Sequence, residues 1–293
     1  MILRNTPPEG FLETEERCNF KVPAEMKKVW AVQIDLMIEL IKVCQKHGLR
    51  IYADGGTLIG AVRHQGFIPW DDDIDMAMLR EDYDKLVEIA PKEFSHPYFF
   101  QCIYTDNHYD HRHAQLRNCE TASWPINKKK LPKYNHGIFI DIFVLDGMPN
   151  NPKALCKHYS KIKKAKMRLK LTTKLTSMLP ESIYQFCREK TSCLSDKVQF
   201  KKYEDLLRSV PCSKSFLLSK ITLRYNHPFK EVACYGEPKM VPFEYTEIPI
   251  MENYDQVLKV QFGDYMTPTH TPTYHGTMNY DTEHSYLDVL KMK

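Results

Sequence analysis

The segment YADGGTLIGAVRHQGFIPWDDDIDMAM, residues 52–78, combines a glycine-rich turn with a dense run of carboxylates. Four of the five residues from 71 to 75 are aspartates, and apolar residues flank them on both sides. Two carboxylates about 4 Å apart repel each other by roughly 4 kcal/mol at an effective dielectric constant of about 20. A hard divalent cation, which prefers oxygen ligands, relieves this repulsion. The acidic run therefore predicts a site for Mg²⁺ or Mn²⁺.

The spacing of the aspartates suggests which of them bind the metal. The large apolar residues at 74, 76 and 78 alternate with Asp73, Asp75 and Ala77, which predicts a half-buried strand. Asp73 and Asp75 would then project from the same face, with Cα atoms roughly 6.6 Å apart. Asp71 is a further predicted ligand, although Asp71 and Asp72 could instead cap the preceding Pro-Trp turn. A solvated acidic loop is the alternative for the whole run, and the flanking apolar residues disfavour it.

The residues before the acidic run suggest a phosphate site. A strand is predicted for 50–53 and a helix for 57–64. The intervening Gly55 and Gly56 allow the backbone to approach a ligand, and the start of a helix offers N–H groups to phosphate. Thr57, Arg63 and His64 are the side chains in this segment that we predict to bind phosphate. For Arg63 a structural salt bridge is an equal alternative, and His64 could simply cap its helix.

These motifs resemble the signature of the LicD family, the phosphocholine transferases related to fukutin and the fukutin-related protein. The family belongs to the nucleotidyltransferase-fold superfamily, in which a Gly-Gly-Ser/Thr turn precedes an Asp-x-Asp strand and a third carboxylate lies on a later strand. Asp141 is the matching candidate, in the middle of the apolar, alternating segment 136–146. The resemblance implies an α/β (α+β) fold, with a nucleotidyltransferase-like mixed sheet flanked by helices.

Asp141 is costly to bury in an apolar strand unless it has a partner. We predict that the partner is a metal ion held jointly with Asp73 and Asp75. A buried arginine, for example Arg63 or Arg117, is the alternative. Arg117 closes a predicted strand and is also a candidate ligand of a pyrophosphate group, because its guanidinium can bind two oxygens at once.

The rest of the chain divides into three predicted parts. Helices alternate with strands in the first part, which is typical of an α/β domain. The predicted helices are 23–46, 80–90 and 253–262, and further strands are predicted at 98–103 and 113–117. The predicted parts are a catalytic core (1–146), a basic helical insertion (147–230) and a C-terminal segment that packs back on the core (231–293).

The start of the predicted insertion is strongly basic. Residues 147–180 contain no Asp or Glu, and Lys and Arg recur from 153 to 174 beside an apolar stripe. This pattern predicts an amphipathic helix. Contact with an anionic membrane surface and an ordinary solvated helix face are equal alternatives. The segment lacks the interleaved aromatic residues of many nucleic-acid-binding proteins, so we predict no nucleic-acid partner.

Composition indicates where the protein acts. The nine cysteines are scattered without a Cys-x-x-Cys motif, which favours a reducing compartment. No apolar stretch resembles a signal peptide or approaches the roughly 20 residues of a membrane-spanning helix. We expect a cytoplasmic location, with peripheral contact at the inner face of the membrane.

The resemblance also implies the reaction. A metal held by Asp73, Asp75 and Asp141 would bind the pyrophosphate of a CDP-linked donor such as CDP-choline. Phosphocholine, or a similar substituted phosphate, would pass to a hydroxyl of a cell-surface glycan or a lipid-linked saccharide, and Asp141 or Asp71 would accept its proton. A nucleotide-sugar-dependent glycosyltransferase that uses the Asp-x-Asp motif is the main alternative. A non-enzymatic scaffold is a second one.

Overall fold

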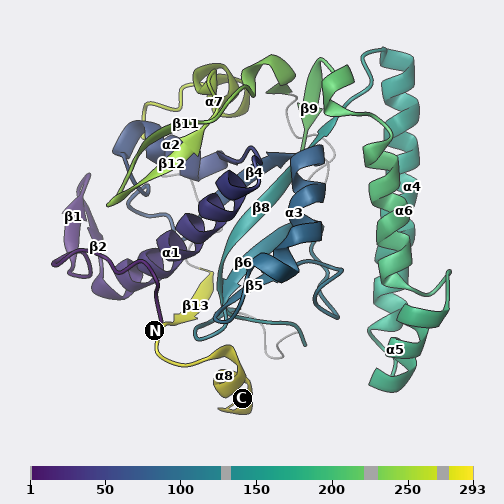
Figure 1. Cartoon of the computed structure of the whole chain (residues 1–293), viewed down its shortest axis with the longest axis horizontal. Coiled ribbons are helices and arrows are strands. Elements are labelled where there is room, and N and C mark those ends of the chain that lie inside the picture. Colours follow the sequence, from purple (N-terminus) through teal and green to yellow (C-terminus); the bar gives the residue numbers. More distant parts are fainter. Residues whose placement is uncertain (1, 127–132, 221–229, 269–276, 293) are drawn as a thin grey trace.

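The chain folds around a mixed, seven-stranded β-sheet (Figure 1). The computed structural model describes residues 2–126, 133–220, 230–268 and 277–292. Helices pack against the sheet, so the predicted α/β class with a mixed sheet is confirmed. The strands of this sheet are β3 (Tyr52–Ala53), β4 (Asp75–Leu79), β5 (Tyr98–Gln101), β6 (Ala114–Asn118), β8 (Ile138–Gly147), β9 (Leu217–Ser219) and β10 (Lys230–Glu231).

The long strand β8 organises this sheet. β4 pairs with it in parallel along one edge, whereas β6 and β9 pair antiparallel along the other. β3, β5 and β10 extend the sheet outward from these three strands. A parallel pair requires a crossover connection, and the helix that follows β4 lies within it. The alternating apolar residues of β8 are buried at Ile138, Ile140, Ile142 and Val144.

The other described strands form three two-stranded sheets. β1 (Glu15–Arg17) pairs with β2 (Phe20–Val22), β11 (Lys239–Phe243) with β12 (Thr246–Ile250), and β7 (Ala122–Pro125) with β13 (Met278–Asp281). The described helices are α1 (Ala24–Lys46), α2 (Gly55–His64), α3 (Arg80–Glu93), α4 (Pro152–Thr176), α5 (Glu181–Lys190), α6 (Asp196–Arg208), α7 (Tyr254–Phe262) and α8 (Tyr286–Met292), with short 3₁₀ turns at Cys212–Lys214 and Val232–Cys234.

The first helices agree with the sequence pattern except at their ends. α1 begins after Pro23 and ends before Gly48, whose positive φ of 62° stops the helix. Trp30 and Ile34 on its apolar stripe are fully buried. α3 extends to Glu93, three residues beyond the predicted end, and contains Pro91 in its last turn. A proline so near the end removes one helical hydrogen bond without displacing the rest of the helix.

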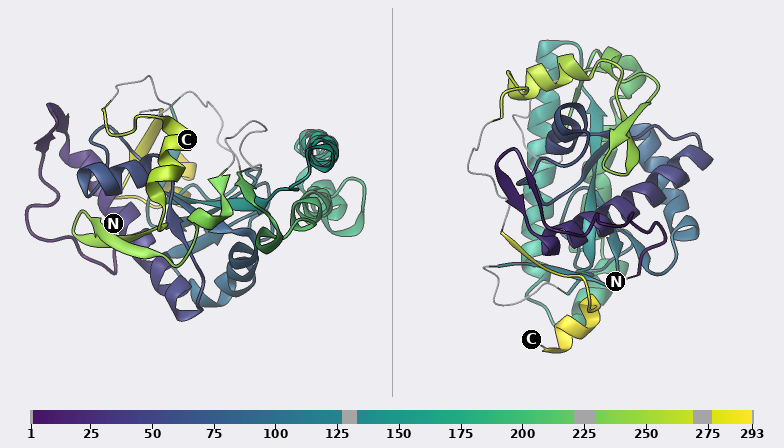
Figure 2. Two further views of the ribbon diagram at one scale, coloured as in Figure 1. Left: turned by 90° about the horizontal axis from the view of Figure 1, so that it is seen from above. Right: turned by 90° about the vertical axis from the view of Figure 1, so that its left-hand side faces the viewer.

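α4, α5 and α6 form a helical layer at the edge of the molecule. Figures 1 and 2 show α4 and α6 side by side, on the side opposite the β1–β2 hairpin. The amphipathic helix predicted for 153–174 is confirmed as α4. A small apolar cluster that includes Ile103, Ile162 and Phe200 joins this layer to the core.

The proposed division into three parts stays a prediction. β9 lies within the predicted insertion 147–230 and β10 crosses its end, and both strands extend the central sheet. In the C-terminal part, α7 and the β11–β12 hairpin contact α2 and β3, while β13 pairs with β7. In the described part of the chain, the helices are either too short or too polar to cross a membrane.

Candidate active site

The glycine turn lies directly against two of the aspartates. α2 begins at Gly55, two residues before the predicted start, and the φ of Gly55 is +57°. A Cβ atom at Gly55 would lie 3.1 Å from Oδ2 of Asp75, and one at Gly56 only 2.6 Å from Oδ2 of Asp71. The missing side chains therefore make room for the carboxylates, a function of the glycines that the sequence motif did not reveal.

Hydrogen bonds lock the turn to the start of β4. The backbone N–H of Asp75 donates to Oγ1 of Thr57 over 2.8 Å, and the N–H of Asp54 donates to the carbonyl of Asp75 over 3.0 Å. The Thr57 hydroxyl is thus already engaged with backbone in this structure. Its predicted contact with phosphate stays a prediction.

The register of β4 and β8 brings together carboxylates that are far apart in sequence. The two strands pair with Asp75 opposite Asp141, and the N–H of Asp141 donates to the carbonyl of Ile74. β4 begins at Asp75, so Asp73 lies in the loop before the strand and not on a strand face as the alternation suggested. The loop conformation allows Asp73 to face the other aspartates of the run.

Three consecutive aspartates form the tightest carboxylate group. Asp71, Asp72 and Asp73 each offer an oxygen within 4.8 Å of the other two, an arrangement that could hold a metal ion. We did not include Asp72 among the predicted ligands. Burial, followed by the charges of Asp73 and Asp141, raises the pKa of Asp75 well above its usual range. The acidic residues therefore repel one another, and this donor set of hard oxygens fits Mg²⁺ or Mn²⁺.

Asp141 has protein partners in addition to the neighbouring aspartates. Nε2 of His113 lies 2.9 Å from its Oδ1, and Nε2 of Gln115 donates to the same oxygen over 2.7 Å. Burial favours protonation of Asp141, but the charge of His113 and these two hydrogen bonds outweigh it and lower its pKa. Neither His113 nor Gln115 was predicted, because only the pairing of β6 with β8 places them beside Asp141.

The predicted basic ligands lie in different surroundings. Arg117 is buried and donates to Gln101, to the carbonyl of Gly137 and to Gln115, so it supports the residue that holds Asp141. Arg63 donates to His64 and to the carbonyl of Tyr265. Arg63 and His64 lie in the last turn of α2, roughly 12 Å along the helix from the glycine turn at 1.5 Å per residue. The structure therefore does not bring these two residues to the carboxylates, and phosphate binding by all three stays a prediction.

A buried charged group supports the glycine turn from behind. Asp54 is fully buried, and its carboxylate accepts from Nζ of Lys230 over 2.9 Å and from Lys220. Burial lowers the pKa of Lys230 to about 8, although the charge of Asp54 opposes the shift. The lysines lie more than 160 residues after Asp54, so no local sequence signal pointed to them.

Part of the sequence matches a known family. Residues 48–163 match the family described as LicD/FKTN/FKRP, nucleotidyltransferase domain. The matched segment contains the glycine turn, the aspartate run and β8 with Asp141. It also includes His113 and Gln115, so the complete carboxylate site lies within the region shared with this family.

Three relatives illustrate the similarity. The chain is 28% identical over 231 residues to the lipopolysaccharide cholinephosphotransferase LicD of Haemophilus influenzae, a match that covers 76% of this chain and 84% of the relative. It is 31% identical over 116 residues to an uncharacterized protein of Rickettsia prowazekii, with 40% of each chain covered. A shorter match of 54 residues, 42% identical, covers 18% of this chain and 11% of the human ribitol 5-phosphate transferase FKRP.

Proposed function

We propose that this chain, which matches the LicD/FKTN/FKRP family over residues 48–163, is a member of that family and transfers a substituted phosphate to a hydroxyl group of a saccharide. We propose phosphocholine, or a similar phosphate ester, as the transferred group and a CDP-alcohol such as CDP-choline as its donor. The acceptor would be a cell-surface glycan or its lipid-linked precursor. The names of two relatives, a cholinephosphotransferase and a ribitol 5-phosphate transferase, support this reaction class.

The observation that supports the proposal best is the convergence of the carboxylates. The parallel register of β4 and β8 places Asp75 beside Asp141, and the loop before β4 adds three more aspartates. Such a group would repel the phosphates of a nucleotide unless cations intervene. When Mg²⁺ is bound by the aspartates at 71–73 with Asp75 and Asp141, it would supply the positive charge that a transferred phosphate requires.

The protein residues would orient the reacting groups. The acceptor hydroxyl would attack the phosphorus distal to cytidine, forming a new P–O bond while the bond to the CMP oxygen breaks. Asp141, held by His113 and Gln115, or Asp71, held beside Gly56, would accept the hydroxyl proton. The N-terminal end of α2 would lie next to the phosphates, where backbone N–H groups favour negative charge.

We propose that the reaction takes place at the cytoplasmic face of a membrane. The basic helix α4 would contact anionic lipid there through the lysines and arginine between 153 and 174. Each Lys or Arg near an anionic surface contributes about 1 kcal/mol to binding. This location would bring the carboxylate site close to a lipid-linked saccharide.

Thermal unfolding with a panel of nucleotides tests the donor. CDP-choline, CDP-ethanolamine, CDP-ribitol, CTP and UDP-glucose would each be added with and without Mg²⁺. We expect one CDP-alcohol to raise the Tm by several degrees, and only in the presence of Mg²⁺, because a ligand that binds the folded state alone stabilises it. Incubation of that donor with a saccharide acceptor should release CMP.

Two variants assign the response to the site. Asp73→Asn should abolish both the Mg²⁺-dependent shift and CMP release, while Asp205→Asn should leave both unchanged, because Asp205 forms an exposed ion pair on α6. Full activity of Asp73→Asn would refute the metal site. A shift with UDP-glucose alone, with release of UDP, would instead favour the glycosyltransferase.

A further inference from the structure

A large cavity lies between the helical layer and the core, apart from the carboxylates. Its volume is about 1100 Å³. The loop between β5 and β6 forms one wall through Ile103, His108 and Arg112, and α4 forms another. None of the aspartates at 71–75 lines it, nor does Asp141. Most of its α4 wall lies beyond residue 163, outside the segment that matches the family.

The walls carry positive charge that the described residues do not neutralise. Five of the cations that line the cavity are Arg112, Lys163, Lys166, Lys170 and Lys174. Among the described residues, no carboxylate forms an ion pair with any of these five. Nε of Arg112 is also buried without a hydrogen-bond partner. Arg112 and Lys166 line the same cavity, and burial, followed by the charge of Arg112, lowers the pKa of Lys166. An anion between them would satisfy both.

The acidic residues of the cavity do not supply that anion. Asp196 is buried and lies 2.5 Å from Nη1 of Arg188, and Tyr184 also donates to it. Asp110 faces His111, with 3.8 Å between their polar atoms. Glu181, which does not line the cavity, lies 2.7 Å from Nζ of Lys133, a sixth cation of the wall, and 3.0 Å from Nε2 of His108. The charge left over at Arg112 and along α4 is therefore positive.

The cavity also has an apolar side that continues onto the surface. Ile103, Leu169 and Phe200 line its interior. Met167 lines the cavity as well, although 64% of its surface is exposed. It begins a stripe of exposed apolar residues at helical spacing. The stripe consists of Met167, Leu171 and Leu175 on α4 and Met178, which lies just beyond the end of α4.

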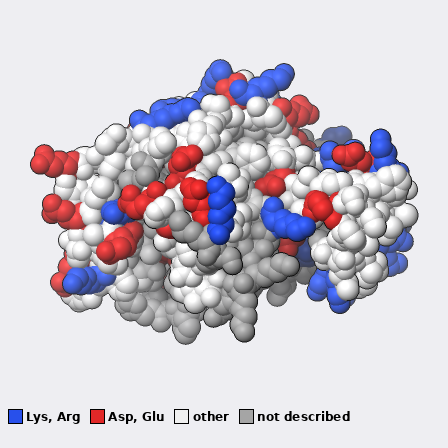
Figure 3. Space-filling model, turned by 90° about the horizontal axis from the view of Figure 1, so that it is seen from below, with Lys and Arg blue, Asp and Glu red and all other residues white. Residues whose placement is uncertain are grey.

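The outer end of the helical layer has the same mixed character. Figure 3 shows this end as a broad surface without charged side chains, bordered mainly by Lys and Arg. Met178 is 78% exposed, and Phe186 on α5 is 62% exposed. Exposed apolar residues that are contiguous and surrounded by charge usually mark a surface that binds a partner. A ligand that fits this arrangement needs both an anionic group and an apolar chain.

We propose that the cavity binds the lipid phosphate of a lipid-linked saccharide, with the phosphate between Arg112 and Lys166 and the hydrocarbon chain along Met167 and the apolar stripe. The basic residues match the charge of a phosphate or diphosphate, and the stripe matches an aliphatic chain. The cavity would thus be a subsite for the acceptor, and this assignment rests on the proposed function. The binding of a lipid phosphate in the cavity does not depend on the proposed function.

The chain connects this subsite to the carboxylates. Arg112 is followed directly by His113, whose ring contacts Asp141. A lipid phosphate at Arg112 would therefore sit on the same loop that positions a carboxylate of the site. The saccharide attached to that phosphate could extend toward Asp141 while the lipid chain remains at the outer helices.

Binding of farnesyl diphosphate to the full chain tests the proposal. Titration followed by calorimetry, without divalent metal, should show saturable binding to one site. Inorganic pyrophosphate lacks the apolar chain and farnesol lacks the anion, so each should bind at least about tenfold more weakly. Arg112→Gln and Lys166→Gln should each weaken farnesyl diphosphate binding by about tenfold, the effect of losing one charge-assisted hydrogen bond.

Lys164→Gln is the matched control, because Lys164 is exposed on the same helix and does not line the cavity. It should bind as the wild type does. Equal binding by pyrophosphate and farnesyl diphosphate would leave a simple anion site and overturn the lipid assignment. Wild-type binding by both cavity variants would overturn the site itself. Asp73→Asn should bind farnesyl diphosphate normally, so a failure of the nucleotide experiments would not be confused with a failure here.

Discussion

At the residue scale, the candidate site is a group of aspartate carboxylates that the fold holds close together despite their mutual repulsion. The two glycines of the turn leave space for Asp71 and Asp75, and the strand register adds Asp141. His113 and Gln115 relieve only Asp141, whose pKa is lowered, whereas the pKa of Asp75 is raised by burial and by Asp73 and Asp141. The protein therefore maintains unfavourable charge where a cation is expected to bind.

Replacement of Asp75 tests this electrostatic strain. In the absence of metal at pH 7, Asp75→Asn should stabilise the fold, because burial and the charges of Asp73 and Asp141 disfavour the ionised carboxylate that the substitution removes. Because the folded-state pKa is raised, the folded protein holds more protons than the unfolded chain between the two pKa values, and stability falls as pH rises through that window. The gain should therefore vanish at acidic pH, where Asp75 is neutral in both states.

Urea unfolding in EDTA at pH 7 and near pH 3, below the pKa of an unfolded aspartate, measures both effects. Mg²⁺ should stabilise the wild type and have little effect on the variant. Asp205→Asn, at an exposed ion pair on α6, provides the control. A loss of stability at pH 7 in Asp75→Asn would contradict a repulsive cluster.

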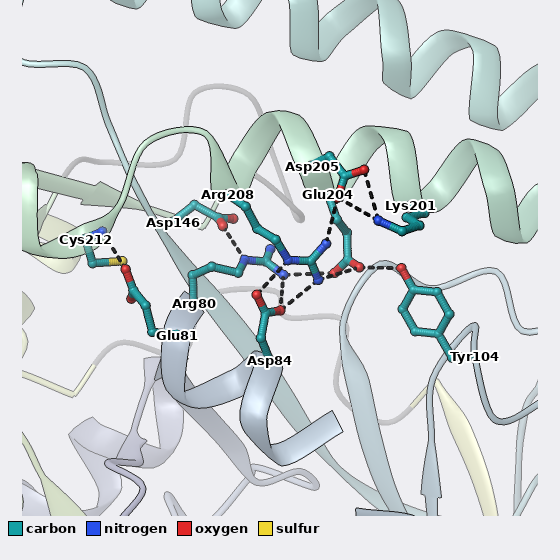
Figure 4. A network of polar contacts seen from close by, with 10 residues as sticks. All are labelled: Arg80, Glu81, Asp84, Tyr104, Asp146, Lys201, Glu204, Asp205, Arg208 and Cys212. Atoms are coloured by element: carbon teal, nitrogen blue, oxygen red, sulfur yellow. Dashed lines mark hydrogen bonds and ion pairs between the residues drawn. The ribbon is translucent and has the colours of Figure 1, made fainter. Parts of the chain in front are cut away.

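At the scale of elements, a buried ion network attaches the helical layer to the sheet. Figure 4 shows Arg80, at the start of α3, between Asp146 of β8 and Glu204 of α6. Its Nε lies 2.7 Å from Asp146 and its Nη1 lies 2.8 Å from Glu204, and all three side chains are at most 4% exposed. Arg208 of α6 binds Asp84 of α3 and also contacts Glu204. The network thus ties α6, and with it the lipid subsite, to the strand that carries Asp141.

Arg80→Met should destabilise the protein by about 3–5 kcal/mol, because it leaves Asp146 as a buried, uncompensated charge and removes one of the two arginines that pair with Glu204. Equilibrium urea unfolding measures the change. Lys201→Met removes an exposed pair with Asp205 on α6 and should cost at most about 1 kcal/mol. Similar losses in the two variants would show that the network does not hold α6 to the core.

At the scale of the whole molecule, the carboxylate site and the basic helical layer occupy different parts of one fold (Figure 1). The sheet forms the site, whereas α4 and α5 present cations and exposed apolar side chains at the outer edge. This separation suits an enzyme that reacts with a saccharide while its lipid remains in a membrane.

Co-sedimentation with vesicles tests membrane contact. The protein should bind vesicles that contain phosphatidylglycerol, bind neutral phosphatidylcholine vesicles weakly, and dissociate at about 0.5 M salt, where charges are screened within about 5 Å. Met178→Ser combined with Phe186→Ser should weaken binding several-fold. Phe216→Ser is the control, because Phe216 is 75% exposed but lies outside the helical layer. Equal binding to neutral and anionic vesicles would contradict the electrostatic contribution of α4.

The local sequence was sufficient for the α/β class, for α1 and α4, and for the aspartate run as candidate site residues, because periodicity and charge density are properties of neighbouring residues. Asp141 became a candidate through the resemblance to the LicD family, which implies a third carboxylate on a later strand. Contacts between distant segments were not visible in it. The pairing of β4 with β8 placed Asp75 beside Asp141, β6 added His113 and Gln115, and the chain beyond β8 supplied Lys220 and Lys230. Asp73 lies in the loop before β4 and not in the strand, because the pairing of β4 with β8 begins at Asp75. These features depend on strand register and helix packing, which are set by the burial of side chains from the whole chain.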